Sequence, residues 1–176
     1  MMVMLKPQDI IILLKLAIQP VPYEWSYSQL AYELHMSSSE IHKGVRRAAH
    51  ARLFDPNRRR PIRKALEEFL IHGVKYAYAA EIGPMTRGMP TAHSAPVLMK
   101  HLAVSDGDVY VWPHPEGVSR GMALSPLFKT VPYMAARDDR LYQALAALDA
   151  IRLGRARDVA LAESILLQLV RGDGPQ

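Results

Sequence analysis

Two helix-start signals lie eleven residues apart in this chain, and this spacing limits its fold more than any other feature. Ser26 with Gln29, and Ser37 with Glu40, have the spacing of a capping box, in which two side chains satisfy free backbone groups at the start of a helix. Eleven residues hold only about two helical turns and a very short connection. The sequence therefore predicts a helix-turn-helix. Apolar pairs at the positions of a hydrophobic staple flank both boxes: Trp25 with Leu30, and Met36 with Ile41.

The predicted motif places a long helix after a short one. The short helix covers residues 27–34, the turn takes His35 and Met36, and the long helix runs over residues 38–53. Apolar residues of the long helix recur at helical spacing and define a buried side. They are Ile41, Val45, Ala48, Ala49 and Leu53, whereas the other side carries His42, Lys43, Arg46, Arg47 and His50.

Positive charge is concentrated in and just after this long helix. Residues 40–64 hold nine Lys and Arg side chains against two carboxylates, a net charge of +7, whereas the whole chain carries +5. The rest of the chain therefore sums to −2. Charge gathered on one helix and the following turn can face a line of phosphates, although a solvated helix face would look the same. The helix-turn-helix pattern favours nucleic-acid binding over that alternative.

The rest of the chain predicts a mainly α-helical protein, and residues 1–80 are expected to form its first domain. Helices are predicted over residues 7–18 and 61–73, because each has a periodic apolar stripe and a proline suited to a first turn. Between them, residues 54–60 leave room only for a short hairpin. Residues 74–79 alternate apolar and polar-tipped side chains, which predicts an extended segment.

Two further parts complete the predicted organisation. Residues 81–139 are rich in proline and glycine, which predicts an irregular segment with short strands, one of them over residues 109–112. Residues 140–176 predict a pair of helices separated at Gly154. The second helix has more apolar side chains than one amphipathic face requires, so it is either buried within its own chain or meets a second copy. Its nearby charges, Asp149, Arg152, Arg155, Arg157, Asp158 and Glu163, are expected to form ion pairs at the rim of this region.

Residues 30–37 (LAYELHMS), followed by Ile41 and Val45, resemble the helix-turn-helix of bacterial winged-helix regulators of the MarR-like group. The resemblance covers residues 8–73 and rests on helix order, capping and apolar spacing. His35 stands where such proteins commonly have glycine, and the wing is short. The resemblance implies that residues 38–53 are a recognition helix presented to the major groove, and that the protein dimerises through its C-terminal helices to read two half-sites.

The expected DNA contacts follow from these positions. Early polar residues of a helix in the major groove reach base edges, arginine can pair with guanine, and backbone contacts position the protein. A helix N-terminus can also hold a phosphate, which applies to the start of the short helix. The predicted DNA-binding residues are Tyr27, Ser28, Ser38, Ser39, His42, Lys43, Arg46, Arg47, His50, Arg58, Arg59 and Arg60.

The segment around residues 86–93 is a candidate ligand or partner loop. Arg87 would hold an anion, His93 would make a proton-sensitive contact, and Thr86 and Thr91 would add hydroxyl groups. Long loops in compact domains are often functional. The alternative is a surface connection pinned by its prolines.

Several classes of function lack support in the sequence. The chain has no cysteine, its seven histidines do not have metal-ligand spacing, and no catalytic constellation is present, so neither an enzyme nor a cofactor is expected. The apolar run at residues 10–14 is too short for a membrane span, and a cytoplasmic protein is expected. The sequence thus predicts a sequence-specific DNA-binding transcriptional regulator that acts as a homodimer. The alternative is a protein-interaction module, such as an antitoxin or an accessory subunit of a bacterial complex.

Overall fold

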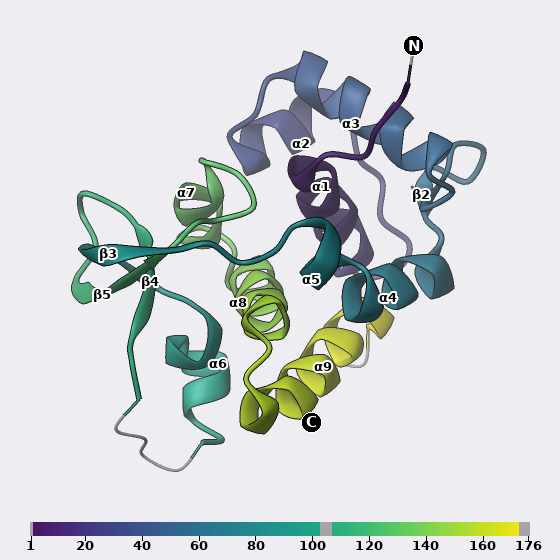
Figure 1. Ribbon diagram of the computed structural model, residues 1–176. Coiled ribbons are helices and arrows are strands. Elements are labelled where there is room, and N and C mark those ends of the chain that lie inside the picture. Colours follow the sequence, from purple (N-terminus) through teal and green to yellow (C-terminus); the bar gives the residue numbers. More distant parts are fainter. Residues whose placement is uncertain (1, 103–106, 173–176) are drawn as a thin grey trace.

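The computed structural model describes residues 2–102 and 107–172, and within these ranges the protein is mainly α-helical. Helices pack around the first helix, and a small three-stranded sheet projects from one side of this helical body (Figure 1). The helices are α1 (Pro7–Ala17), α2 (Tyr27–Leu34), α3 (Ser38–His50), α4 (Arg63–His72), α5 (Val74–Ala77), α6 (Pro96–Met99), α7 (Val131–Ala135), α8 (Asp139–Leu153) and α9 (Ala156–Arg171). The strands are β1 (Phe54–Asp55), β2 (Arg60–Pro61), β3 (Ile82–Pro90), β4 (Tyr110–Pro113) and β5 (Ser119–Leu124).

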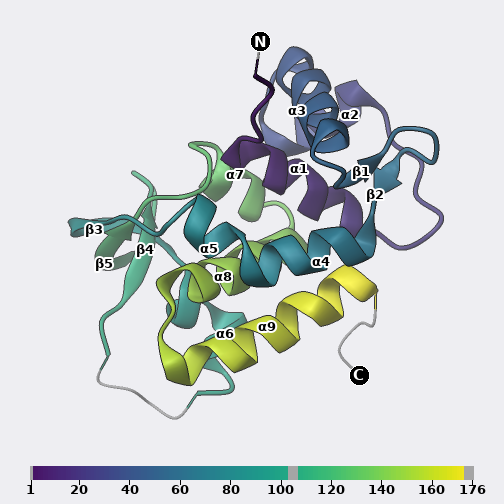
Figure 2. The same cartoon turned by 45° about the vertical axis from the view of Figure 1, so that its right-hand side comes forward.

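Helix α1 lies at the centre of the core. Its apolar run, residues 10–14, is at most 1% exposed, and the helix contacts α3, α8, α9 and β2. The surrounding hydrophobic cluster takes side chains from residues 1–80, 81–139 and 140–176, so the three predicted parts share one core. Figure 2 shows α4 and α9 side by side on one face of this body.

Both predicted helix starts are confirmed. Ser37 and Glu40 form the full reciprocal box. The box predicted at Ser26 is only half formed: the Ser26 hydroxyl accepts a hydrogen bond from the Gln29 amide at 3.1 Å, but the Gln29 side chain donates to Tyr23 and Glu33. Between the helices, His35 adopts the left-handed conformation (φ 52°, ψ 42°) that turns the chain within a very short connection. Histidine is among the non-glycine residues enriched in that conformation, so the turn does not require glycine.

Two predicted helix boundaries are wrong by two or three residues. Helix α3 ends at His50 instead of residue 53, and Arg52 has a positive φ of 61°, which is incompatible with a continuing right-handed helix. Helix α4 begins at Arg63 instead of residue 61. Pro61 lies in strand β2, where it pairs with Phe54. The short hairpin expected here is confirmed.

The extended segment predicted over residues 74–79 is also wrong, and so is the irregular chain predicted for the first part of residues 81–139. The first segment contains the short helix α5 instead of an extended chain, because Gly73 keeps right-handed dihedrals (φ −106°, ψ −44°) and the chain turns again after α4. The second segment contains the nine-residue strand β3 instead of an irregular loop. Strand β3 pairs antiparallel with both β4 and β5, and these two pair in parallel, so the three strands close on one another. The strand predicted over residues 109–112 is β4, one residue later.

Two glycines permit this tight closure. A Cβ atom at Gly88 would lie 2.0 Å from the backbone oxygen of Trp112, and one at Gly121 would lie 2.5 Å from that of Val109. Any side chain at either position would force neighbouring strands apart. The glycines that read as loop signals in the sequence are therefore requirements of strand packing.

The predicted C-terminal helical pair is confirmed, with a left-handed Gly154 (φ 72°) between α8 and α9. Helix α9 packs on α8 and α4 of its own chain, with Leu166, Leu169 and Val170 buried. The rim position predicted for Asp149, Arg152 and Asp158 is wrong, because all three are buried. Asp149 and Arg152 pair at 2.7 Å, and Asp158 contacts Arg155 at 3.2 Å. Asp149 also accepts hydrogen bonds from Thr91 and Trp112, and Arg152 donates to the backbone oxygens of Tyr78, Ala79 and Ser125. Burial raises the pKa of the Asp149 carboxyl, against the opposing effect of Arg152.

Candidate nucleic-acid interface

Helix α3 presents a row of exposed polar side chains opposite its buried face. Its only carboxylate, Glu40, is turned back to cap the helix and does not interrupt the row. Within the described residues, neither Lys43 nor Arg46 forms an ion pair. The structure therefore brings six of the predicted DNA-binding residues onto one exposed, positively charged face. They are Ser38, Ser39, His42, Lys43, Arg46 and His50.

Arg47 lies apart from this row. Its guanidinium makes two hydrogen bonds of 2.7 Å to the carboxylate of Asp9, which is fully buried on α1. These bonds raise the pKa of Arg47 despite the opposing effect of its burial. The helices approach closely here, since a Cβ atom at Gly44 would lie 2.5 Å from the terminal carbon of Ile12 and 2.9 Å from Asp9. The sequence pattern could not distinguish Arg47 from Arg46, because it contains no information about a carboxylate 38 residues earlier.

A stack of side chains joins α3, the start of α2 and the β1–β2 hairpin. The rings of His42 and Tyr27 are parallel within 15°, with centroids 3.5 Å apart. The Arg59 guanidinium lies 4.5 Å from the centroid of Trp25 and 5.8 Å from that of Tyr27. Two hydrogen bonds reinforce this contact, from the Trp25 indole to the Arg59 backbone oxygen (2.9 Å) and from the Arg59 guanidinium to the Trp25 backbone oxygen (3.1 Å). The stack fixes the hairpin relative to α3.

The turn of the hairpin is set by Asp55, whose side chain accepts hydrogen bonds from the amides of Asn57 and Arg58 at 2.9 and 3.2 Å. This Asx-type contact holds the chain in a tight reversal. It leaves three consecutive arginines exposed: Arg58, Arg59 and Arg60. At the start of α2, Ser28 is also exposed, whereas Tyr27 is half-buried in the stack described above.

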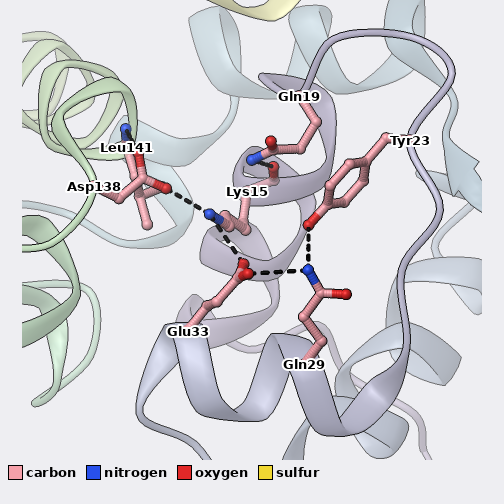
Figure 3. A network of polar contacts seen from close by, with 7 residues as sticks. All are labelled: Lys15, Gln19, Tyr23, Gln29, Glu33, Asp138 and Leu141. Carbon is pink, nitrogen blue, oxygen red and sulfur yellow. Dashed lines mark hydrogen bonds and ion pairs between the residues drawn. The ribbon is translucent and has the colours of Figure 1, made fainter.

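A polar network attaches α2 to the body of the protein (Figure 3). The ammonium of Lys15, on α1, contacts Glu33 of α2 at 3.1 Å and Asp138, the N-cap of α8, at 2.5 Å. Gln29 extends the network by donating to Glu33 at 3.1 Å. Burial lowers the pKa of Lys15, but its hydrogen bonds and ion pairs outweigh burial and raise this pKa above its ordinary value. The network thus links α2 to α8, which begins more than 100 residues later in the chain.

The candidate ligand loop does not form one site. Thr86 and Arg87 lie on strand β3, where Arg87 is exposed and Thr86 is partly exposed. Thr91 is buried, and its hydroxyl donates to Asp149 at 2.7 Å. His93 is also buried, 2.7 Å from the backbone oxygen of Asp108 and 2.8 Å from the Arg155 guanidinium. The two buried residues serve the core, so the structure separates the four predicted residues.

The structure also adds residues that the site prediction missed. The sequence analysis used Trp25 only as a staple residue. Its proximity to Tyr27, together with the later arginine run at residues 58–60, was a usable signal for the stack. Asp9 gave no such signal, because its partner Arg47 lies 38 residues later in the chain.

Comparison with known proteins does not identify a relative: no family model, no curated protein and no solved structure matches this chain. Among the helices of the described part, none combines the length and apolar character needed to cross a membrane.

Proposed function

We propose that this protein is a transcriptional regulator that binds double-stranded DNA in a sequence-specific manner. In this proposal α2 and α3 are a helix-turn-helix, and the β1–β2 hairpin is a short wing. The proposal rests mainly on the row of six exposed polar side chains on α3, which contains no carboxylate and two cations that form no ion pair within residues 2–102 and 107–172.

The reading element is α3. A helix with its side chains is about 10–12 Å wide, which matches the major groove of B-DNA. Ser38, Ser39, His42 and Lys43, on the first half of the helix, would face base edges or the adjacent phosphates. Arg46 would pair with guanine, since a guanidinium can bond the two acceptors on its major-groove edge.

The hairpin and the start of α2 would contact the DNA backbone. Arg58, Arg59 and Arg60 are exposed on the hairpin, and the stack through Tyr27 holds it beside α3. Contacts of this kind position a protein without reading the sequence. Ser28, exposed in the first turn of α2, is a further candidate for a phosphate contact.

The protein is further proposed to act as a cytoplasmic homodimer, because helix-turn-helix proteins commonly read two half-sites related by symmetry. A dimer contact through α9 would use the apolar side chains that remain partly exposed after the helix has packed on α8 and α4. They are Val159, Leu161, Ile165 and Leu167.

A protein partner is the second candidate for the same surface. Tyr32, on α2, is 74% exposed, and both aromatic residues and arginine are enriched at protein interfaces. An acidic protein surface would attract the same arginines. Binding to a stoichiometric acidic protein with no affinity for DNA would favour this interaction module.

DNA binding is tested by measuring affinity for duplex DNA by fluorescence anisotropy from about 50 to 300 mM salt. The double variant Lys43→Ala/Arg46→Ala removes two charges from the α3 row, so the slope of log K against log salt should fall by up to about 1.8, the value for two phosphate contacts. Arg87→Ala/Arg120→Ala is the matched control, because it removes two exposed charges from β3 and β5. Equal slopes for the two double variants would contradict the assignment of α3.

A further inference from the structure

A concave surface, separate from the exposed face of α3, lies beside the β1–β2 hairpin. It is a groove of about 790 Å³ between residues 16–25 and residues 55–63. The chain leading into α2 passes along β2 here without forming a ladder with it. Pro61 has no backbone N–H, so the outer edge of β2 lacks a donor at that position and resists pairing with another strand.

The lining of the groove is strongly cationic. Arg58, Arg59, Arg60 and Arg63 all line it, and among the described residues Asp55 is its only carboxylate. The Asp55 side chain is already engaged by the amides of the hairpin turn and contacts Arg58 at 3.8 Å. In the described part of the chain, Arg60 and Arg63 have no carboxylate partner. Such a surface selects a ligand with several negative charges.

The same groove contains planar and apolar groups. Trp25 and Tyr23 line it, and the guanidinium of Arg59 lies on the Trp25 ring, which gives a flat surface for stacking. Leu16 and Ile62 add apolar lining. The volume lies in the range of 300–1,000 Å³ that is typical of small-molecule sites.

We propose that this groove binds a nucleotide. Its base would stack on the Trp25–Arg59 surface, and its phosphates would be held by Arg58, Arg60 and Arg63. The phosphates of the nucleotide would occupy Arg58 and Arg60, which are also proposed contacts to the DNA backbone. Bound nucleotide therefore weakens DNA binding. This regulatory consequence rests on the proposed function, whereas nucleotide binding itself does not.

The test uses the full chain without DNA, with ATP and GTP as probes and inorganic triphosphate as the comparison. Binding is followed by equilibrium dialysis and by quenching of Trp25 fluorescence, with Trp25→Phe identifying the signal of the second tryptophan, Trp112, which is buried. At least one nucleotide should bind saturably at near-physiological salt, about tenfold more tightly than triphosphate, because stacking adds to the phosphate contacts. Absence of saturable binding, or equal binding of nucleotide and triphosphate, would overturn the proposal.

Two variants separate this site from the DNA surface. Arg63→Ala, in the groove but outside the proposed DNA contacts, should weaken nucleotide binding about tenfold or more. Arg46→Ala, on α3 and outside the groove, should change nucleotide binding less than about twofold. Equal losses in the two variants would show non-specific attraction and overturn the site. If DNA binding fails, the nucleotide titrations still stand, and if it succeeds, nucleotide should lower DNA affinity in the wild type but not in Arg63→Ala.

Discussion

Replacing two neighbouring arginines of α3 should affect different properties: Arg46→Ala should weaken DNA binding, and Arg47→Ala should lower the stability of the fold. Arg46→Ala removes an exposed cation from the proposed DNA surface, whereas Arg47→Ala removes the partner of a fully buried carboxylate. Both substitutions shorten the same side chain on the same helix and remove the same charge. Each therefore controls for the other.

The structure determines the size of the difference. Without Arg47, Asp9 keeps a hydrogen bond from the Lys6 amide at 2.8 Å but loses both bonds to the guanidinium. Breaking a buried ion pair from one side costs about 3–5 kcal/mol. Because the Arg47 side chain is 14% exposed, we expect a cost near the lower end, about 3 kcal/mol. Arg46 is exposed and has no carboxylate partner among the residues that the structure describes, so its loss should cost less than about 0.5 kcal/mol.

Urea unfolding followed by circular dichroism measures this difference. With a slope of about 2 kcal/mol per M urea, Arg47→Ala should lower the midpoint by roughly 1.5 M, and Arg46→Ala by less than about 0.25 M. Adding Asp9→Asn to Arg47→Ala should restore about 1 kcal/mol or more, since it removes the unpaired charge. An unchanged midpoint for Arg47→Ala, or no recovery on adding Asp9→Asn, would refute the account of this pair.

Three other features lead to separate predictions. Burial raises the pKa of Tyr142 to about 12, whereas an unfolded tyrosine ionises near 10. The free energy of unfolding should therefore fall as the pH rises from 10 to 12, and Tyr142→Phe should reduce this loss in urea titrations at alkaline pH. Gly121→Ala should lower the melting temperature by several degrees, because its Cβ atom would meet the Val109 backbone oxygen, and calorimetry would show it. Leu166→Glu should unfold the protein, because it buries a charge in the core, whereas Ile165→Glu should yield a folded monomer if α9 forms the dimer interface. Light scattering measures the outcome, and a folded Ile165→Glu dimer would place the interface elsewhere.

Local signals in the sequence were sufficient to predict the helices and the turn of the candidate site. Ser26, Ser37 and Glu40 act on backbone groups within three residues, and the buried face of α3 follows a helical period that any single helix shows. The closed sheet was not predictable in this way. Its proline- and glycine-rich strand β3 reads as a loop, and only the partners more than 20 residues away make it a strand.

Charged residues mark the second limit of sequence reasoning. Arg46, Arg47 and Arg152 look alike in the sequence, yet one is exposed, one pairs with α1 and one is buried beside Asp149. His93 is a similar case: the sequence analysis placed it in an exposed ligand loop, but its side chain is buried. The fate of such a side chain depends on which distant carboxylate or carbonyl folding brings beside it.

Selection of bound duplexes from a random DNA pool, at near-physiological salt, tests the central claim most directly. The wild-type protein should enrich one sequence motif, present as two inverted half-sites with centres about 10 base pairs or a multiple of this apart. A folded His42→Ala/Arg46→Ala variant should lose this preference, while Arg87→Ala/Arg120→Ala should keep it. Failure of the folded wild-type protein to enrich any motif would contradict sequence-specific recognition by α3.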